Sequence, residues 1–348
     1  MTTSTDGGKL GATSATMAML QLLAGGWAAS AIHAAATLGL ADLLKDRSKT
    51  CAELAKASNT HPSSLRRLLR ALAAVGLFTE EQGGQFSLTP LGATLRSDVA
   101  SSLRAWAEYA QGDEAYRAWG SLLHSVRSGE TAFNHAHGLS VWEHRSAHEE
   151  HASRYHKAMA SLGGPLNDAA IASYPFSEIK TIVDVGGGDG SLLVALLTKH
   201  PAMSGALLDV SHVAEKGRKR LAEAGLSARC EVIAGDALIG VPGGADAYVL
   251  SRVIHDWPDA QAVAILKSCS RAMHGCTRLL IIERVLPTKV EASANVAMQV
   301  VPDLNMMVMT GGRERTQEEF TSLLAAAGLR LKRIIPTLSP ISVMEAGL

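Results

Sequence analysis

The stretch Arg252-Val-Ile-His-Asp-Trp-Pro-Asp259 brings together three side chains that could take part in chemistry. It follows the apolar run DAYVLS, which predicts a buried strand. His255 can exchange a proton near neutral pH, Asp256 carries a charge, and Trp257 offers a large ring. A strand that merely turned into a loop would not need these residues together. The end of this strand is therefore the first candidate for a functional site.

Acidic residues follow three other predicted strands. Asp184 lies in the stretch DVGGGDG, Asp209 ends the next apolar run, and Asp236 follows the third, in IAGDA. Open α/β sheets bind ligands at the carboxyl ends of their strands. An acid about 20 residues after a glycine-rich turn is placed to bind a ribose diol. These positions predict a nucleotide site.

The glycine-rich turn discriminates between nucleotides. Gly186 and Gly188 allow the backbone to approach a ligand closely. Asp184 and Asp189 lie around these glycines, and their carboxylates would repel the pyrophosphate that a dinucleotide places on a helix N-terminus. The same carboxylates suit an ammonium or a sulfonium group. The turn therefore predicts S-adenosylmethionine rather than NAD.

The elements that position these residues are apolar runs alternating with helical stretches: TIVDVG, GALLDV, CEVIAGD, DAYVLSRVI and RLLIIERVL. This alternation predicts a largely parallel sheet with helices between its strands. The last two runs, LKRIIPT and ISVMEAGL, are separated by only a few residues and predict an antiparallel hairpin at the sheet edge. Residues 176–348 are therefore predicted to form a Rossmann-like α/β domain.

Residues 1–110 have a different pattern. A polar terminus of about 12 residues is predicted to be irregular. CAELAKAS, HPSSLRRLLRALAAVGLF and FSLTPLG then predict two helices and a small hairpin that turns at Gly83-Gly84. The second helix is predicted to begin at His61-Pro62-Ser63-Ser64, with a serine as cap. This is a winged-helix pattern, and residues 111–175 are predicted to be a helical linker region that contributes to a pocket.

A winged helix raises the possibility of DNA binding, and Arg66, Arg67 and Arg70 lie on its second helix. Residues 1–110 hold 10 Lys and Arg against 8 Asp and Glu, and the whole chain has 33 of each kind. Because DNA affinity depends mostly on neutralising phosphates, we expect this domain to form a dimer and not to bind nucleic acid.

The apolar segment 15–44 is interrupted by Gln21, Ser30, His33 and Thr37. It follows no basic cluster of the kind that a signal peptide needs. We therefore expect its helices to pack on protein rather than cross a membrane, and the chain to be cytoplasmic. The four cysteines are Cys51, Cys230, Cys269 and Cys276. None forms a CxxC pair, so we expect buried free thiols in a reducing compartment.

Histidines are concentrated between residues 135 and 156. They are His135, His137, His144, His148, His151 and His156. His144 and His148 are four apart, so they would share one face of a helix. Glu149 and Glu150 beside them complete no clear set of metal ligands. We expect these histidines to line a pocket or to face solvent, and we predict no metal.

The order of these motifs resembles that of the small-molecule O-methyltransferases similar to caffeic acid O-methyltransferase, with bacterial relatives that act on polyketides, phenazines and carotenoids. The matching stretches are VDVGGGDGSLL, LLDV, GDAL, RVIHDWPD, IIERVLP and GGRERTQEEF. The winged-helix pattern also matches the dimerisation domain of that family. The resemblance implies an S-adenosylmethionine-dependent enzyme with a class I methyltransferase sheet that acts as a homodimer on a small acceptor and releases S-adenosylhomocysteine.

The resemblance also implies a role for each matched residue. His255 matches the general base, and Glu283 and Glu314 match two carboxylates that flank it. The implied cofactor residues are Asp184, Gly186, Gly188, Asp209, Asp236, Ala237, Ser251, Arg252 and Trp257. Of these, Asp209 would bind the ribose, and Asp236 and Trp257 would lie near the adenine. Relatives often carry a lysine where this chain has Ser251, which predicts weaker cofactor binding or binding through the serine hydroxyl.

By the same resemblance, the acceptor would lie between the helices that precede the sheet domain and the segment VVPDLNMMVMTGG. The implied acceptor residues are Trp142, Tyr155, Met159, Asp256, Asn305, Met306 and Met309. Methionine side chains suit flat, variable ligands, but core packing is the alternative for each of them. We expect His255 to face the acceptor and Trp257 to face the cofactor, with Asp256 turned away or helping to orient the histidine.

The expected chemistry follows from the pKa of a phenol, which lies near 10. A neutral imidazole in hydrogen-bond reach can take the phenol proton as the methyl group moves, and a neighbouring carboxylate stabilises the resulting imidazolium. Two other classes of function stay open: an N-methylating or non-methylating enzyme on the same fold, and a DNA-binding regulator that senses a small molecule.

Overall fold

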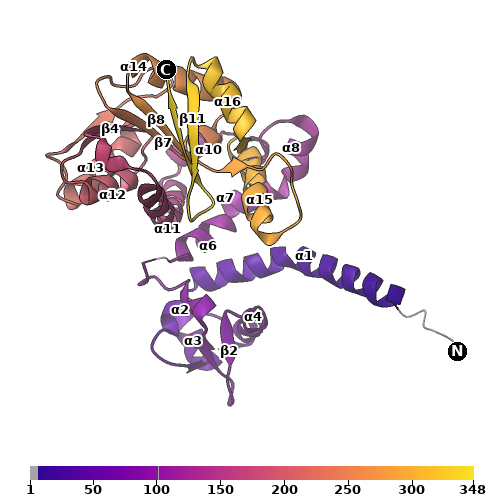
Figure 1. Cartoon of the computed structure of the whole chain (residues 1–348). Coiled ribbons are helices and arrows are strands. Elements are labelled where there is room, and N and C mark those ends of the chain that lie inside the picture. Colours follow the sequence, from indigo (N-terminus) through magenta and orange to yellow (C-terminus); the bar gives the residue numbers. More distant parts are fainter. Residues whose placement is uncertain (1–6, 101) are drawn as a thin grey trace. The chain divides into compact units, whose positions relative to one another are not determined.

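The computed structural model describes residues 7–100 and 102–348 (Figure 1), and the side chains among them from residue 15 onward. An irregular terminus was predicted for residues 1–12. Residues 1–6 lie outside the described residues, and the chain is helical from Gly7 onward, so the prediction is wrong for residues 7–12. The structure divides into two compact units, Met1–Tyr116 and Arg117–Leu348. Domain boundaries at 110 and 175 were predicted from the sequence; residues 117–175 belong to the same unit as the sheet.

The first unit contains the predicted pair of helices followed by a hairpin. Its elements are α1 (Gly7–Thr37), α2 (Leu40–Leu43), β1 (Lys49–Thr50), α3 (Cys51–Ser58), α4 (Pro62–Ala74), β2 (Phe78–Glu80), β3 (Gln85–Leu88), α5 (Pro90–Ala93) and α6 (Arg104–Ala110). The three short strands form an antiparallel sheet in the order β1-β3-β2. The cap of α4 differs from the prediction, because the ring of His61, not a serine, accepts the backbone N–H of Ser64.

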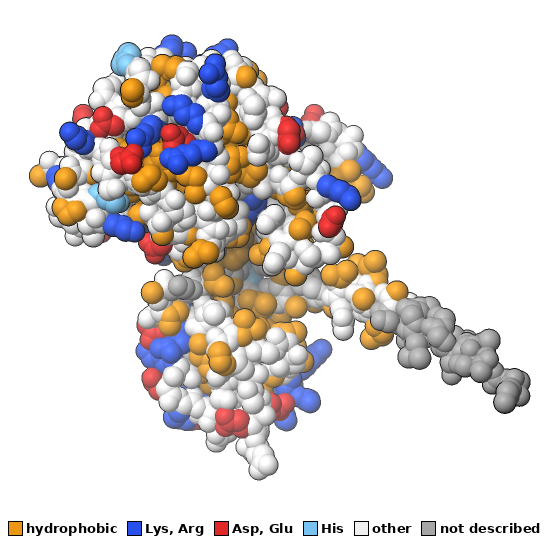
Figure 2. Space-filling model, in the orientation of Figure 1, with side chains coloured by type: hydrophobic (Ala, Val, Ile, Leu, Met, Phe, Trp, Pro, Cys, Tyr) orange, Lys and Arg blue, Asp and Glu red, His pale blue; other side chains and the backbone are white. Residues whose placement is uncertain are grey.

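Helix α1 is apolar and largely exposed within its unit. Residues Ala15–Thr37 are long and apolar enough to cross a membrane by length and composition alone. Ala35 and Ala36, near its end, are buried in the core of the unit, so this part packs on protein as expected. Leu22, Leu23 and Trp27 are 76%, 67% and 81% exposed. Figure 2 shows hydrophobic side chains along this helix.

The second unit is an α/β domain. After α7 (Asp113–Gly120), which crosses the division between the units, its helical part comprises α8 (Leu122–Ser128), α9 (Ala132–His137), α10 (Val141–Ala147) and α11 (Glu149–Ser173). The sheet part comprises β4 (Thr181–Val185), α12 (Ser191–Lys199), β5 (Ser204–Asp209), α13 (Ser211–Glu223), β6 (Cys230–Ala234), β7 (Ala247–Ser251), α14 (Asp259–Ala272), β8 (Arg278–Glu283), β9 (Val285–Leu286), α15 (Ala294–Met309), β10 (Arg315–Thr316), α16 (Gln317–Ala326), β11 (Arg330–Pro336) and β12 (Ser342–Gly347). Two short 3-10 turns, Phe176–Glu178 and Ile254–Asp256, interrupt the loops.

Seven strands form the main sheet in the order β11-β12-β8-β7-β4-β5-β6. The five strands from β8 to β6 are parallel, and β11 and β12 add the predicted antiparallel hairpin at one edge. The order reverses at β4, whose neighbours are β5 and β7. A crevice at such a reversal, at the carboxyl ends of the strands, is where this kind of sheet binds ligands.

The sheet is covered on both faces, so neighbouring residues in each strand enter different cores. In β4, Ile182 packs with α12, whereas Val183 packs in the core that contains α14 and α16. Because both faces of these parallel strands are buried, their sequences are nearly continuous apolar runs. In β4, β5, β7 and β8 a polar residue lies at or next to the carboxyl end, namely Asp184, Asp209, Ser251 and Glu283, which places these side chains on the sheet edge that carries the site.

The histidines of α9, α10 and α11 form a group of rings. His124, which precedes the predicted group, stacks on His135 with ring centroids 3.9 Å apart. The rings of His144 and His148 stack at 4.4 Å, and Nδ1 of His148 donates to the carbonyl oxygen of His144. His156 is half-buried, and burial, followed by the charges of Lys216 and Arg145, lowers its pKa to about 4. His156 therefore stays neutral at physiological pH.

The cysteines are free thiols, as predicted. Burial was predicted for all four and holds for Cys230 and Cys269, but it is wrong for Cys51, which is half-buried, and for Cys276, which is exposed. Burial raises the pKa of Cys230 and Cys269 to about 12, so these two thiols are unreactive.

Candidate active site

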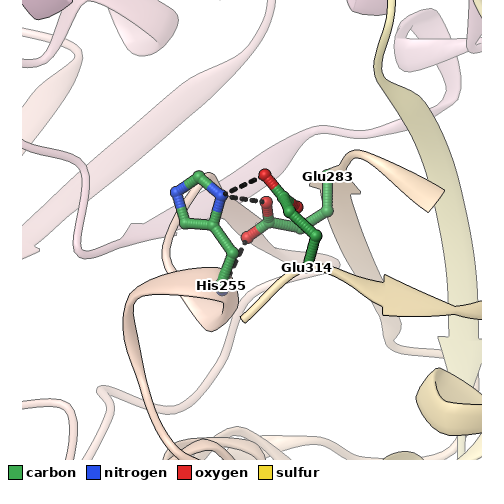
Figure 3. Close-up of side chains that lie close together, drawn as sticks. All are labelled: His255, Glu283 and Glu314. Carbon is green, nitrogen blue, oxygen red and sulfur yellow. Dashed lines mark hydrogen bonds and ion pairs between the residues drawn. The ribbon is translucent and has the colours of Figure 1, made fainter. Parts of the chain in front are cut away.

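His255 lies in the 3-10 turn that follows β7, at the carboxyl edge of the sheet. Its strand neighbour β8 ends at Glu283. The short parallel pair β9 and β10, with Arg315 opposite Val285, brings Glu314 to the same place. Three segments that are far apart in the sequence thus converge on one imidazole (Figure 3).

The two glutamates contact one side of the His255 ring. Nδ1 lies 3.2 Å from Oε1 of Glu314 and 3.3 Å from Oε2 of Glu283. The backbone N–H of His255 donates to the other oxygen of Glu283. In Figure 3 the second ring nitrogen, Nε2, points away from both glutamates. An imidazole held by Nδ1 in this way keeps Nε2 on the side away from the glutamates, and that this side faces the acceptor stays a prediction.

Charge sets the protonation of this cluster. Burial disfavours the imidazolium, but the negative charges of Glu283, Asp256 and Glu314 outweigh it and raise the pKa of His255 to about 10. The two glutamates differ from each other. Burial raises the pKa of Glu283, whereas the hydrogen bond from His255 and the charge of Arg284 outweigh burial and lower the pKa of Glu314.

Besides the His255 hydrogen bond, Arg284 contributes to this difference, because its guanidinium donates to Oε1 of Glu314 at 3.0 Å. Among the described residues, His255, Glu283 and Glu314 form the only group whose ligand atoms lie close enough to hold a metal ion, all within 4.8 Å of one another. The Arg284 cation beside them opposes the binding of a second cation there. The geometry suits a proton better than a metal.

The turn that carries His255 is held by the segment around Glu314. The backbone N–H of Arg313 donates to the carbonyl oxygen of His255 at 2.9 Å. Arg315 is 1% exposed and donates to the carbonyl oxygens of Ile254 and Trp257, on either side of His255. A Cβ atom at Gly312 would collide with the carbonyl oxygen of His255. One segment therefore fixes both the backbone of the histidine and one of its carboxylates.

The glycine-rich loop after β4 turns through glycines with positive φ. Gly186 and Gly188 have φ angles of 70° and 61°, which only glycine adopts readily. Asp209, at the end of β5, accepts the backbone N–H groups of Gly188 at 2.8 Å and Val210 at 2.7 Å. Asp189 accepts the backbone N–H of Ser191 at the start of α12 and pairs with Arg220 at 2.8 Å. Of the two acids predicted to favour a cationic ligand, Asp189 therefore already has a cationic partner.

Asp184 is the other of these acids, and it is 1% exposed. Its Oδ2 atom is buried with no hydrogen-bond partner, as is the hydroxyl of Ser251 at the end of β7. Burial raises the pKa of Asp184 to about 7, Asp209 adds to this rise and Arg252 opposes it. Buried polar atoms without partners are costly in a protein. A cationic ligand with N–H donors at this edge would satisfy the Asp184 carboxylate.

Arg252 has an unusual backbone conformation for a residue with a side chain, with φ at 57°. Such a residue costs about 1–3 kcal/mol, and such residues cluster at functional sites. Its guanidinium reaches Oδ1 of Asn167 on α11 at 3.3 Å. Arg252 thus links the end of β7 to α11 on the side of the glycine-rich loop.

The predicted adenine residues lie further along the same edge. Asp236 is exposed, and its carboxylate accepts the backbone N–H of Leu238 at 2.8 Å. Ala237 and Trp257 are both partly buried against one face of the sheet core, beside Leu238. Asp256 does not turn away from His255, because its Oδ1 lies 3.9 Å from Nε2.

Apart from Asp256, which lies in the 3-10 turn of His255, the predicted acceptor residues belong to α10, α11 and α15. The rings of Trp142 and Tyr155 meet edge to face, with centroids 6.4 Å apart. Asn305 accepts a hydrogen bond from the indole N–H of Trp119 at 3.1 Å. Met159 and Met306 are half-buried, whereas Met309 is 2% exposed and belongs to the packed interior. For Met309 the structure supports core packing.

Four residues near these sites were not among the predicted ones: Trp119, Arg145, Arg284 and Arg315. Arg284 and Arg315 stand directly beside the two predicted glutamates in IIERVLP and GGRERT. A charged residue inside an apolar run was the signal that could have identified Arg284. Nothing in the local pattern marks Arg145, which packs against Tyr155 from another helix.

The arginines on α4 give little support to DNA binding. Arg70 pairs with Glu80 at 3.1 Å, and Arg66 lies 3.9 Å from the same carboxylate. All three arginines are exposed, but Glu80 offsets part of their charge. The absence of a nucleic-acid partner stays a prediction.

Comparisons with known proteins agree with this geometry. The O-methyltransferase domain family matches residues 119–330, and the O-methyltransferase dimerisation domain family matches residues 20–98. The chain is 40% identical to the phenazine O-methyltransferase PhzM of Lysobacter antibioticus, over 98% of this chain and 99% of the relative. It is also 36% identical to the 8-amino-8-demethylriboflavin N,N-dimethyltransferase of Streptomyces davaonensis, over 90% of each chain.

The solved structure of a similar protein contains the cofactor. The O-methyltransferase NcsB1 from neocarzinostatin biosynthesis, in complex with S-adenosylmethionine and 2-hydroxy-5-methyl naphthoic acid, is 37% identical to this chain. The match covers 91% of this chain and 95% of that one, with a TM-score of 0.79. The sequence-based expectations of family, fold, enzyme class and cofactor are thereby confirmed. With its sheet, glycine-rich loop and dimerisation domain, the chain belongs to the S-adenosylmethionine-dependent O-methyltransferase family.

Proposed function

We propose that this protein transfers a methyl group from S-adenosylmethionine to a phenolic hydroxyl of a small aromatic metabolite, with His255 as general base. The observation that carries the proposal is the His255 imidazole, held at Nδ1 by two buried glutamates with Nε2 directed away from them. Relatives named for phenazine and for a naphthoic acid complex support an aromatic acceptor.

The cluster is suited to the proton of a phenol. The pKa of about 10 at His255 lies near the pKa of an ordinary phenol. When the imidazole is neutral, the proton therefore moves from the hydroxyl oxygen to Nε2 with little change in free energy, while the oxygen forms its bond to the methyl carbon. Glu283 and Glu314 stabilise the imidazolium that results, as the aspartate does in serine hydrolases.

The cofactor would be held by the loop and strand ends described above. When bound, S-adenosylmethionine supplies a methyl group on a positively charged sulfur, which keeps the bonding electron pair and becomes the thioether of S-adenosylhomocysteine. The unpartnered carboxylate oxygen of Asp184 and hydroxyl of Ser251 fit an ammonium group with N–H donors. Asp209, next to Gly188, fits the ribose. Orientation of the reacting groups by these residues supplies the remaining acceleration.

The test is methyl transfer to hydroxylated aromatic acceptors with isotopically labelled cofactor, comparing wild type with His255→Ala. General-base assistance contributes about 10²–10⁴-fold, so the variant should lose kcat by that factor while its affinity for S-adenosylmethionine is unchanged. Full turnover by the variant would exclude His255 as the base.

N-methylation is the second candidate, because one relative is named as an N,N-dimethyltransferase. A neutral amine attacks without first losing a proton, so N-methylation needs less help from a base. Turnover of an aromatic amine that survives His255→Ala, with no turnover of the matching phenol, would favour this candidate.

The oligomeric state is also a proposal. The family's dimerisation domain matches residues 20–98, and Leu22, Leu23 and Trp27 on α1 are exposed in the single chain. Exposed apolar surface of this kind commonly marks an interface. We therefore infer a homodimer that covers this helix. The cytoplasmic location and the absence of a membrane partner stay predictions.

A further inference from the structure

The carboxylate of Asp303 on α15 holds the backbone of Glu314. Its Oδ1 atom accepts the backbone N–H of Glu314 at 2.7 Å, across a separation of 11 residues. Between the two residues the chain leaves the helix and turns back at Gly311, whose φ is 75°. Asp303 is half-buried. The proposed reaction assigns no role to this carboxylate.

This hydrogen bond holds the residue whose side chain orients the base. Oε1 of Glu314 lies 3.2 Å from Nδ1 of His255. Glu314 is 2% exposed, and a side chain in so closely packed a place has little room to compensate for a shift of its own backbone. A displaced backbone at Glu314 would therefore lengthen the contact between the carboxylate and the imidazole.

The other contacts of this segment lie on either side of the Asp303 bond. Before it, the backbone N–H groups of Thr310 and Gly311 donate to the carbonyl oxygen of Met306, so these residues continue the end of α15. After it, Arg315 donates to carbonyl oxygens of the 3-10 turn that carries His255. Asp303 ties α15 to the segment at Glu314 itself, between these two sets of contacts.

The charges around Asp303 do not favour an acid at this position. Burial raises its pKa, and the charges of Glu314 and Glu319 add to the rise. The N–H of Glu314 and the charge of Arg313 oppose it, but Arg313 forms its own ion pair with Glu319. A carboxylate near other carboxylates is disfavoured unless hydrogen bonds compensate. The hydrogen bond to Glu314 is what this side chain contributes.

We propose that Asp303 is a positioning residue that fixes Glu314, and through it the imidazole of His255, relative to α15. The inference rests on the proposed function, because it concerns the base of that reaction. Asn305 and Met306, which the sequence assigns to the acceptor, lie on the same helix. One helix then holds both the acceptor and the carboxylate that orients the base, and such fixed geometry is a source of rate acceleration.

Two competing explanations are that Asp303 only adds negative charge near His255, or that it only stabilises the fold. Asparagine separates charge from hydrogen bonding, because its amide oxygen accepts the same N–H without a charge, whereas alanine removes both. A role that runs through Glu314 also makes the effects of the two residues non-additive, which a double-mutant cycle measures.

The experiment measures the pKa of His255 by NMR, in protein that contains isotopically labelled histidine and is saturated with S-adenosylhomocysteine. The signal is assigned by its loss in His255→Ala. The proteins are wild type, Asp303→Ala, Asp303→Asn, Glu314→Gln, the double variant of Asp303→Ala with Glu314→Gln, and Glu291→Gln. Glu291 is exposed and pairs with Lys289, so its variant controls for the loss of one negative charge. The kcat of each protein is measured with one phenolic acceptor.

We expect Asp303→Ala to lower the pKa of His255 by about 1 unit, because Glu314 moves away from the imidazolium that it stabilises. Its kcat should fall by about 10–100-fold, up to the cost of a misplacement of about 1 Å, with unchanged affinity for S-adenosylhomocysteine. Asp303→Asn should keep most of the wild-type pKa and kcat, and Glu291→Gln should keep both. When Glu314→Gln is already present, Asp303→Ala should have little further effect on either quantity.

Equal effects of Asp303→Ala and Asp303→Asn would assign the role to charge and overturn the proposal. Additive effects of Asp303→Ala and Glu314→Gln, or an unchanged pKa in Asp303→Ala, would do so as well. A large fall in the unfolding temperature or in cofactor-product affinity would assign the bond to stability instead. Because the pKa is measured without turnover, these outcomes are separate from the proposed function. The expected pKa changes together with full turnover by His255→Ala would contradict the proposed function alone.

Discussion

Glu283 and Glu314 have the same side chain, but they have different roles because their surroundings differ. Glu314 has Arg284 beside it, which keeps it ionised, whereas Glu283 is buried with no cation but His255 among the groups acting on it. Pairs of acids whose pKa values are pushed apart in this way indicate which group titrates. We infer that Glu314 stays ionised and orients His255. The protonation state of Glu283, by contrast, changes together with that of His255.

The first prediction concerns pH. The base form of His255 exists above its pKa of about 10, so kcat/KM of wild type should rise with pH through the range from 7 to about 10. Glu283→Gln removes the largest favourable charge on the imidazolium, which lowers the pKa of His255 and moves the rise to lower pH. The measurement is a pH profile of kcat/KM with one phenolic acceptor. The titration of the acceptor itself is common to both proteins, so their difference reports His255.

Arg284→Met should have the opposite effect. Removing a positive charge beside Glu314 stabilises any cation nearby, so the pKa of His255 should rise further and the profile should move to higher pH. The glutamate also loses a buried ion-pair partner, which costs about 3–5 kcal/mol of stability. Thermal unfolding of the variant checks that cost. Profiles that shift in the same direction for both variants would contradict this account of the cluster.

At the scale of elements, the site depends on the contact between two segments, the 3-10 turn of His255 and the segment of residues 312–315. The segment that contains Gly312, Glu314 and Arg315 contacts the 3-10 turn of His255 through backbone, side-chain and steric contacts at once. The pair β9 and β10 is only two residues long on each side. So short a ladder is weak alone, and the buried Arg315 supplies the additional hydrogen bonds.

Gly312→Ala should therefore displace the histidine. The added methyl group collides with the backbone of His255 and Asp256, and a displacement of about 1 Å can cost about 10²-fold in rate. We expect kcat to fall by about that factor with a smaller change in cofactor affinity. Gly164→Ala on α11 is the matched control, because a Cβ there meets nothing within 4 Å. An unaffected kcat in Gly312→Ala would show that the contact is not needed.

At the scale of the whole molecule, the first unit has apolar surface that its own core leaves exposed. Its core contains only the last part of α1, while Leu22, Leu23 and Trp27 remain in solvent. The parallel-sheet unit, by contrast, is buried on both faces and has two separate cores. The chain can thus complete its larger unit alone, whereas the smaller one presents a surface that suits association.

Leu22→Glu combined with Leu23→Glu should weaken the proposed homodimer. Burying one such side chain contributes about 1.5–3 kcal/mol, so the double variant should raise the dissociation constant by at least about 10²-fold. Light scattering after size-exclusion chromatography measures the mass directly. Gln21→Glu introduces a charge on the same helix without removing an apolar residue, and it should leave the dimer intact. A wild-type protein that is monomeric would refute the proposal.

The sequence by itself determined the fold class, the order of the strands along the chain, the cofactor class and the His255, Glu283 and Glu314 set. The fold class and the cofactor class follow from local patterns, namely apolar runs that alternate with helical stretches, glycines after a strand and acids at strand ends. The set His255, Glu283 and Glu314 was implied by the resemblance to a family. Tertiary structure decided which partners these residues have. Arg220 pairs with Asp189 and Arg284 with Glu314, although nothing in their spacing along the chain indicates it. For Asp256 the sequence left two orientations open, and the structure places its carboxylate 3.9 Å from Nε2 of His255. Such pairings arise from the packing of separate elements, and so do the burial and charge that set each pKa.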